Sequence, residues 1–99
     1  MSHIYNRVAL IGLGLIASSM AHAMRRGNLA GQIVGHSRSI DTQKKAISLE
    51  IFDEVFGSAK EAVENADLVV LCVPVGAMGS VAKDISVYMK TGSTLTDVG

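Results

Sequence analysis

The chain has 99 residues, with nine Lys and Arg balanced by nine Asp and Glu, so its formal net charge is zero. This length fits one domain, and the balanced charge argues against a nucleic-acid partner, which would bind through its phosphates to a basic patch. Cys72 is the single cysteine, which excludes an internal disulfide and a zinc site built from several cysteines. The three histidines lack metal-ligand spacing, so we predict no metal site.

The sequence carries no sign of export or membrane insertion. Its N-terminus has no signal-peptide pattern, and its longest apolar run, over residues 68–73, is far shorter than the roughly 18 residues of a membrane span. A single thiol also fits a reducing compartment. We therefore expect a cytoplasmic protein with no membrane partner.

Short apolar runs alternate with segments of helical periodicity along the chain. The runs predict strands over residues 8–11, 32–36, 54–56, 68–73 and 93–98. The periodic segments predict helices over residues 15–26, 41–50, 59–65 and 77–89. This alternation predicts the α/β class, with a Rossmann-type doubly wound parallel sheet of about five strands between two layers of helices. We treat residues 1–99 as one domain.

Apolar side chains recur at helical spacing in the first predicted helix. Ile16, Met20 and Met24 follow one another every four residues, with Ala23 beside them. These residues are expected to form the face that packs on the sheet. Gly27 is expected to end the helix, because glycine readily adopts the left-handed conformation found there.

A glycine-rich motif joins the first predicted strand to this helix. Residues 12–17, Gly-Leu-Gly-Leu-Ile-Ala, fit the pattern G-x-G-x-x-G/A in the strand-to-helix context that the pattern requires. Gly12 permits the tight turn, Gly14 lets the backbone approach a pyrophosphate, and Ala17 keeps the helix close to the strand. The helix N-terminus supplies free N–H groups for the phosphates. We therefore predict a dinucleotide site, and the alternative is a plain glycine-rich turn.

No carboxylate follows the second strand, where NAD-binding chains place one about 20 residues after the motif. The residues here are Ser37, Arg38 and Ser39, and Asp41 comes later, near the start of a helix that it or Ser39 would cap. Two hydroxyls and a guanidinium would hold a 2′-phosphate, which a carboxylate would repel. We predict that NADP is preferred over NAD; alternatively, Arg38 is a solvated surface charge. His36 either packs on the adenine or ribose or is a partly exposed loop residue.

The fourth predicted strand runs into Cys72, Val73, Pro74 and Val75. Ligands of doubly wound sheets bind outside the carboxyl ends of the strands, so we expect these residues to line the cofactor cleft beside Gly12. Cys72 is expected to be a small buried hydrophobe rather than a nucleophile, because no base lies near it in the sequence.

Three segments are more specific than a generic Rossmann match. They are residues 8–19 (VALIGLGLIASS), 66–76 (ADLVVLCVPVG) and 96–99 (TDVG). Together they resemble the prephenate dehydrogenase family, which includes the cyclohexadienyl and arogenate dehydrogenases of tyrosine biosynthesis, and the resemblance covers essentially the whole chain. Enzymes of this family oxidise and decarboxylate prephenate or arogenate by hydride transfer to NAD or NADP.

The resemblance implies roles for particular positions. It implies that the pyrophosphate is held by Gly12, Leu13, Gly14, Leu15 and Ile16. It implies that the adenosine ribose lies at Ser37 and Arg38, where many NAD-using members carry an acidic residue that is missing here. It implies that the wall on the nicotinamide side is formed by Val73, Pro74 and Val75.

The resemblance also implies that part of the enzyme lies beyond Gly99. The family's catalytic histidine, the serine that follows TDVG, and the helical domain that binds substrate and forms the homodimer all fall there. We therefore expect residues 1–99 to be a cofactor-binding fragment without catalytic residues, which binds cofactor without turnover. The alternatives are another Rossmann dehydrogenase, such as a β-hydroxyacid dehydrogenase or a ketopantoate-type reductase, and a non-catalytic nucleotide-binding module.

Overall fold

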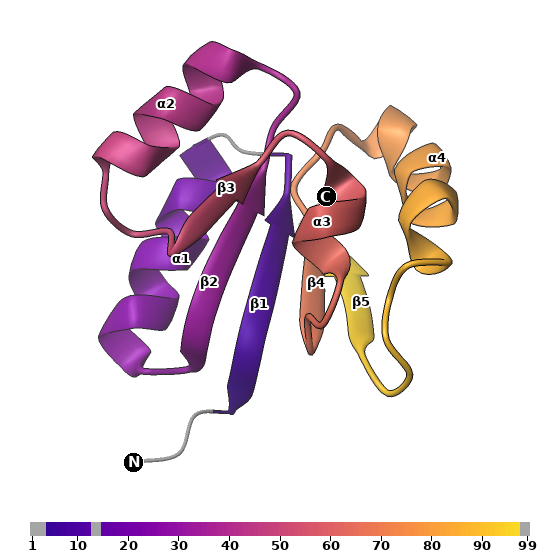
Figure 1. The fold of residues 1–99 in the computed structure, drawn as a ribbon, viewed down its shortest axis with the longest axis horizontal. Coiled ribbons are helices and arrows are strands. Elements are labelled where there is room, and N and C mark those ends of the chain that lie inside the picture. Colours follow the sequence, from indigo (N-terminus) through magenta and orange to yellow (C-terminus); the bar gives the residue numbers. More distant parts are fainter. Residues whose placement is uncertain (1–3, 13–14, 98–99) are drawn as a thin grey trace.

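Five parallel strands form one sheet in the order β3-β2-β1-β4-β5 (Figure 1). The computed structural model describes residues 4–12 and 15–97. The strands are β1 (Tyr5–Ile11), β2 (Ala30–His36), β3 (Glu54–Phe56), β4 (Leu68–Leu71) and β5 (Thr94–Asp97). The helices are α1 (Leu15–Gly27), α2 (Ile40–Ser48), α3 (Ala59–Val63) and α4 (Val75–Ser86). The strand order confirms the predicted doubly wound α/β fold.

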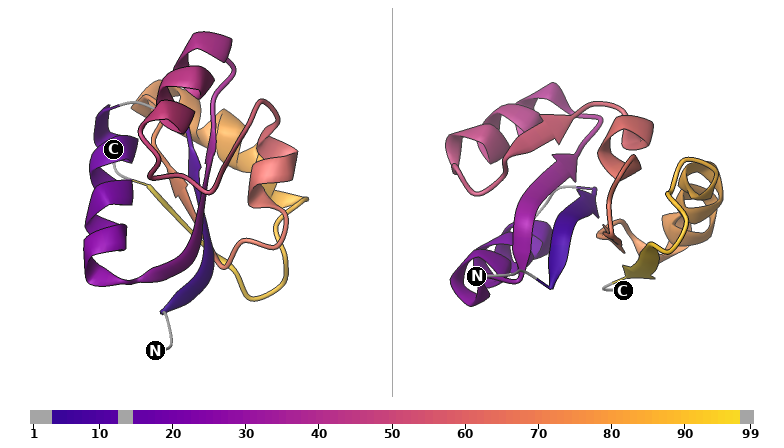
Figure 2. Two further views of the ribbon diagram at one scale, coloured as in Figure 1. Left: turned by 60° about the vertical axis from the view of Figure 1, so that its left-hand side comes forward. Right: turned by 60° about the horizontal axis from the view of Figure 1, so that its bottom comes forward.

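The helices cover both faces of the sheet, which gives the predicted three layers (Figure 2). On one face, α1 and α2 contribute Ala21 and Ala46 to a buried core. On the other face, α3 and α4 contribute Val63 and Ile85 to a second core. Within residues 4–12 and 15–97, no helix has the length and apolar character needed to cross a membrane.

The central strands are buried because apolar side chains occupy both of their faces. In β1, Val8 and Leu10 join the core under α1 and α2, whereas Ala9 and Ile11 join the core under α3 and α4. The side chains of β4 alternate between the two cores in the same way. The continuous apolar runs of these two strands are thus strands covered on both sides, as the sequence predicted.

The inner face of α1 is built mainly from small residues. Ala17, Ala21 and Met24 are buried, and Met20 is half-buried. Ala23 is exposed, so its predicted place on the apolar face is wrong. The buried stripe runs through positions 17, 21 and 24, where two alanines let the helix lie close to β1 and β2.

The connection from β4 to α4 lies two residues earlier in the chain than predicted. β4 ends at Leu71 rather than at residue 73, although the N–H of Cys72 still donates to the carbonyl of Ile11 at 2.8 Å. Pro74, with φ of −56°, caps α4, which begins at residue 75 rather than 77. The fixed φ of proline suits the start of a helix. The strand therefore ends early because the chain turns directly into α4, which also ends earlier than predicted, at Ser86.

Several other element ends also differ from the sequence prediction by one to three residues. β1 and β2 start earlier than predicted, because Tyr5 and Ala30 already pair in the parallel register. Gly27 belongs to α1, and the residue in the left-handed conformation after it is Asn28, with φ of 52°. Asparagine tolerates this conformation better than most residues.

A carboxylate joins three strands at the amino edge of the sheet. Oδ2 of Asp67 accepts the backbone N–H groups of Asn6 at 2.8 Å and Arg7 at 3.0 Å. Its Oδ1 forms an ion pair with Lys90, and its backbone carbonyl accepts the N–H of Thr94 at 2.9 Å. Asp67 therefore fixes the beginning of β4 against the beginnings of β1 and β5.

A second carboxylate acts in the same way between β2 and β3. Oδ2 of Asp53 accepts the backbone N–H of Ile33 at 2.7 Å and the Nη2 of Arg25 at 2.6 Å. Arg25 also donates through Nε to the carbonyl of Ile51 at 3.1 Å. The last turn of α1 is thus tied to the segment that leads into β3.

Candidate functional site

A cavity of about 440 Å³ opens at the carboxyl edge of the sheet. The connections after β1, β2, β3 and β4 all contribute to its walls, and one side of α4 closes it. Its lining residues are Ile11, Gly12, His36, Ser37, Arg38, Gly57, Ala59, Val73, Pro74, Ala77, Val81, Asp84 and Ile85. Ligands of doubly wound sheets bind at this edge.

Gly12 is required at the end of β1 by both its conformation and its neighbours. Its φ is +87°, a region that residues with a Cβ rarely adopt. A Cβ at this position would also stand 2.6 Å from Cγ1 of Val73. Its N–H donates to the carbonyl of His36 at 3.0 Å, which fixes the turn against the end of β2. The tight turn expected at Gly12 is therefore present.

The segment after β2 is held in place by its own hydrogen bonds. The N–H of Ser39 donates to Oγ of Ser37 at 3.1 Å, and the side chain of Gln43 donates to the carbonyl of Ser37 at 2.7 Å. Oγ of Ser39 accepts the N–H of Thr42 at 3.3 Å and so caps α2. Ser37 is buried, whereas Arg38 is exposed at the cavity. Ser39 is not among the described lining residues.

His36 is buried at the cavity and has an unsatisfied ring nitrogen. Its side chain is 9% exposed, and its Nδ1 has no hydrogen-bond partner among the described residues. Burial lowers the pKa of His36 below its ordinary value, and the nearby Arg38 charge lowers it further, against a hydrogen bond with the Gly57 backbone that raises it. A neutral imidazole with an unpaired Nδ1 is therefore available to a ligand. The alternative of a partly exposed loop histidine is wrong.

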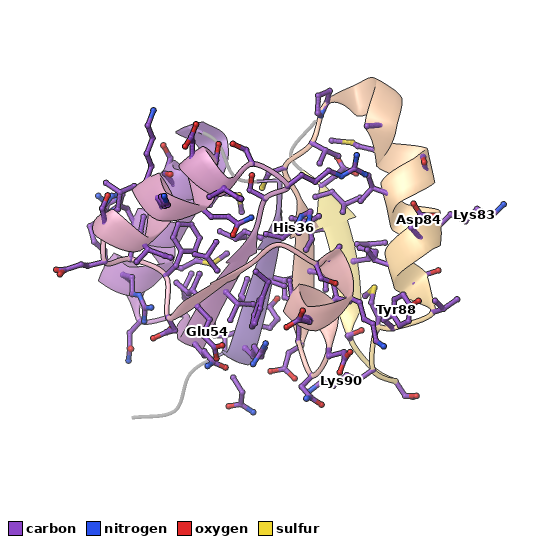
Figure 3. All side chains as sticks on the ribbon, turned by 45° about the horizontal axis from the view of Figure 1, so that its top comes forward. His36, Glu54, Lys83, Asp84, Tyr88 and Lys90 are labelled. Carbon is purple, nitrogen blue, oxygen red and sulfur yellow. The ribbon has the colours of Figure 1, made fainter. Side chains whose placement is uncertain are left out.

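One side of α4 forms a wall that the sequence analysis did not assign to the site. Ala77, Val81 and Asp84 recur at helical spacing, and Ile85 lies beside them. Figure 3 shows that the adjacent Lys83 projects away from the sheet. The 3-to-4-residue spacing of Ala77, Val81 and Ile85 in the helix predicted over residues 77–89 is the sequence signal that could have indicated this wall.

Cys72 belongs to the core rather than to the cavity. It is half-buried and packs against the core under α1 and α2, and it is not among the described lining residues. Burial raises the pKa of its thiol to about 11, so the thiolate is disfavoured near neutral pH. The structure agrees with a small buried hydrophobe, while its neighbours Val73 and Pro74 do line the cavity.

Several predicted positions fall outside the described part of the chain. Leu13 and Gly14 lie outside the described residues, and for Leu15, Ile16 and Val75 only the backbone is described. Among the described residues, no group of three or more His, Cys, Asp or Glu could hold a metal ion.

The strand order and the position of the cavity define a Rossmann-type nucleotide-binding domain. The chain reverses its direction of winding between β1 and β4, and Gly12, Val73 and Pro74 lie at this switch point. Donors and cationic charge after β2 face an apolar wall on α4. This combination fits a nucleotide, which has anionic phosphates at one end and a flat base at the other.

Comparisons with known proteins agree with this class. The family model of the prephenate dehydrogenase nucleotide-binding domain matches residues 20–99. The cyclohexadienyl dehydrogenase of Zymomonas mobilis is 36% identical over 96 residues, which cover 97% of this chain and 33% of that protein. Prephenate dehydrogenase from Aquifex aeolicus, solved in complex with hydroxyphenyl propionate and NAD+, matches with a TM-score of 0.83 and 29% identity over 93% of this chain and 32% of that one. Synechocystis arogenate dehydrogenase gives a TM-score of 0.85 and 26% identity, covering 94% and 32%.

This chain belongs to the prephenate dehydrogenase family and corresponds to its nucleotide-binding domain. The family resemblance seen in the sequence is therefore confirmed. The chain spans about a third of the length of the relatives that it matches. A 3-hydroxyisobutyrate dehydrogenase from Mycobacterium tuberculosis, with a TM-score of 0.79 and 22% identity, shares the fold alone.

Proposed function

We propose that this chain is the cofactor-binding part of a dehydrogenase that oxidises and decarboxylates prephenate or arogenate, with NADP preferred over NAD. Its family membership supports the reaction class. When bound, the nicotinamide ring supplies the hydride acceptor. The contribution of this chain is to bind and orient the cofactor.

The turn at Gly12 carries the proposal of dinucleotide binding. Its positive φ and its contact with Val73 bring the ends of β1 and β4 together directly before α1. The first turn of α1, beginning at Leu15, has backbone N–H groups without partners in the helix. These groups and the positive end of the helix dipole favour a pyrophosphate at this point.

Ser37 and Arg38 carry the preference for NADP. Ser37 is buried at the end of β2, and Arg38 is exposed at the cavity with its guanidinium available for a phosphate. Asp41, the nearest acidic residue along the chain, lies in the first turn of α2 and is not among the described lining residues. A 2′-phosphate at Arg38 would therefore meet a cation rather than a carboxylate.

Calorimetric titration with NADP and, separately, with NAD tests this proposal. We expect NADP to bind more tightly, and Arg38→Ala to weaken NADP binding about tenfold, the lower end for a hydrogen bond to a charged group at an exposed site. NAD affinity should change little in the same variant. Arg26→Ala is the matched control, because Arg26 is an exposed arginine in the last turn of α1. Tighter binding of NAD, or equal weakening of both cofactors, would overturn the preference.

Turnover is proposed to require residues of the longer enzyme, where substrate binding and the homodimer are also expected. The chain matches only a third of the length of its relatives, which is consistent with this division. Incubation of this chain with prephenate and NADP should therefore produce no NADPH, which is followed by its absorbance at about 340 nm. Prephenate-dependent NADPH production by this chain alone would refute the division.

A further inference from the structure

The α4 wall of the cavity combines an apolar surface with one carboxylate. Ala77 and Val81 are half-buried, and Asp84 follows on the same stripe at the exposed end. Asp84 is the single acidic residue among the described lining residues. Arg38 and His36 lie across the cavity, on the segment that ends β2. The cavity therefore has a cationic side and, on α4, a hydrogen-bond acceptor that cannot donate.

This charge pattern restricts what can lie against Asp84. A phosphate would be repelled there, so the pyrophosphate and the 2′-phosphate belong near Gly12 and Arg38, away from Asp84. A neutral group with N–H donors would be stabilised, because hydrogen bonds to an ionised acceptor are the stronger kind. The adenine ring has one such group, its exocyclic amine.

The position of Asp84 along α4 fits the far end of an adenosine. Ala77 lies close to Pro74, at the end of the cavity that adjoins Gly12. Asp84 is two helical turns further on, which is about 10 Å along the helix axis. This separation is comparable to the length of a nucleoside. The apolar side chains of Ala77 and Val81 lie between these two points and can pack against a flat base.

We propose that Asp84 determines the specificity of this site for adenine, by accepting a hydrogen bond from the 6-amino group of the base. The inference rests on the proposed dinucleotide binding and goes further, because it states which base is selected and by which residue. At position 6, a 6-oxo base would present an acceptor to the carboxylate, and this contact would be repulsive. The buried Nδ1 of His36 lies on the opposite wall and is left for the sugar or the phosphate.

The experiment compares NADP with its deamino analogue, nicotinamide hypoxanthine dinucleotide phosphate, by calorimetric titration of this chain. The two ligands differ at position 6, which carries an amine in adenine and an oxo group in hypoxanthine, and at the adjacent N1, which is an acceptor in adenine and an N–H donor in hypoxanthine. We expect the unmodified chain to bind NADP about tenfold more tightly, the lower end for a charged hydrogen bond because Asp84 is exposed. Asp84→Asn should reduce this ratio to within about threefold, because the amide can donate to a 6-oxo group as well as accept from an amine.

A matched control separates this effect from the loss of one negative charge. Glu54→Gln removes an exposed carboxylate from the beginning of β3 that is not among the described lining residues, and Figure 3 shows Glu54 on the other side of the sheet's width from the labelled Asp84. This variant should keep the full preference for NADP. Urea unfolding followed by circular dichroism should give the same midpoint for the Asp84→Asn variant and the unmodified chain, because the side chain is exposed.

Two outcomes of this titration would overturn the proposal alone, and a third would also overturn the proposed function. Equal affinity of the unmodified chain for both ligands overturns the proposal while leaving dinucleotide binding intact. An unchanged ratio in the Asp84→Asn variant assigns base selection to another group and also overturns it. If neither ligand binds the unmodified chain, the proposed function fails, and this inference fails with it.

Discussion

Replacing Gly12 with alanine tests the turn on which the proposed site depends. The substitution adds a single Cβ, but it places an L-residue at φ of +87° and puts the new carbon 2.6 Å from Cγ1 of Val73. The backbone carbonyl carbon of Cys72 lies 3.4 Å from the same point. Because valine is branched at Cβ and stiff, Val73 cannot move its methyl group aside without a shift of its backbone.

The expected cost has two parts. The left-handed conformation costs an alanine about 1–2 kcal/mol, and an overpacked contact in a dense region costs about 1–3 kcal/mol. Gly12→Ala should therefore lower the free energy of unfolding by about 2–5 kcal/mol, out of the roughly 5–15 kcal/mol typical of a domain. For a chain of this length, such a change lowers the midpoint of thermal unfolding by about 10 °C or more.

Urea unfolding followed by circular dichroism measures this loss, since the chain has no tryptophan for fluorescence. Gly92→Ala isolates the conformational part, because Gly92 has φ of +88° but a Cβ there would meet nothing within 4 Å. Gly79→Ala, in α4 with open space around it, should instead stabilise the chain by about 0.5–1 kcal/mol. Val73→Ala combined with Gly12→Ala should recover most of the contact part.

Equal destabilisation by Gly12→Ala and Gly92→Ala would refute the reasoning. It would mean that the approach of Val73 to the turn has no energetic consequence. A double-mutant cycle without coupling between positions 12 and 73 would lead to the same conclusion.

Three further results are expected. Asp67→Asn should lower the free energy of unfolding at pH 7 by about 1–3 kcal/mol, because hydrogen bonds with Lys90 and the Arg7 backbone lower the carboxyl pKa of Asp67. Since the pKa is lowered in the folded state, the carboxylate stabilises the fold fully above its ordinary pKa of 3.8, and this stabilisation is lost as the pH falls below that value. The pKa of His36 is lowered below 6.5 in the folded chain, so the unfolded state takes up the proton first as the pH falls. The free energy of unfolding should therefore decrease between pH 7.5 and pH 5.5, roughly the range around an ordinary histidine pKa, and it should decrease less in His36→Gln. Cys72, with a pKa of about 11 instead of 9.0, should react with iodoacetamide at pH 8 about 10- to 100-fold more slowly than the same thiol in urea.

These three predictions have separate controls. The effect of Asp67→Asn should shrink in acid, and a constant difference down to pH 3, roughly one unit below an ordinary Asp pKa, would contradict the assigned cause. A pH dependence that is identical in His36→Gln and in the unmodified chain would assign it to other groups. Equal alkylation rates of Cys72 in the folded and unfolded chain would show that its burial does not protect it.

The fold could be predicted because the local sequence patterns of its main strands agree with their tertiary packing. The apolar runs in β1 and β4 are continuous because both faces are covered, and this pattern is visible in the sequence. The glycine at the end of β1 also has a local cause, its positive φ. Element ends were less accurate. The end of β4 depends on where Pro74 begins the next helix, and the left-handed residue after α1 turned out to be Asn28 rather than Gly27.

The site could be predicted only where its chemistry is carried by neighbouring residues in the chain. Ser37 and Arg38 follow a strand and were expected at the cavity, which they line. Their preference for NADP stays a prediction. Asp84 was missed because its place depends on how α4 packs across the sheet. The burial of His36 depends equally on the pairing of β2 with its neighbours, which sequence periodicity does not specify.

Asp53 and Asp67 directly precede β3 and β4, and neither is among the described lining residues of the cavity, so the contacts that join the strands and the residues of the site are separate. Asp67 holds the backbone of β1 near its amino end, and Asp53 holds the backbone of β2 at its middle residue, Ile33. Arg38 and Asp84 are exposed and carry none of these strand-joining contacts, so they can be exchanged without loosening the scaffold. Changes of cofactor or base selectivity are therefore expected to be nearly independent of thermal stability. The same sheet could therefore be adapted to a different nucleotide by substituting Arg38 and Asp84 while Asp53 and Asp67 are kept.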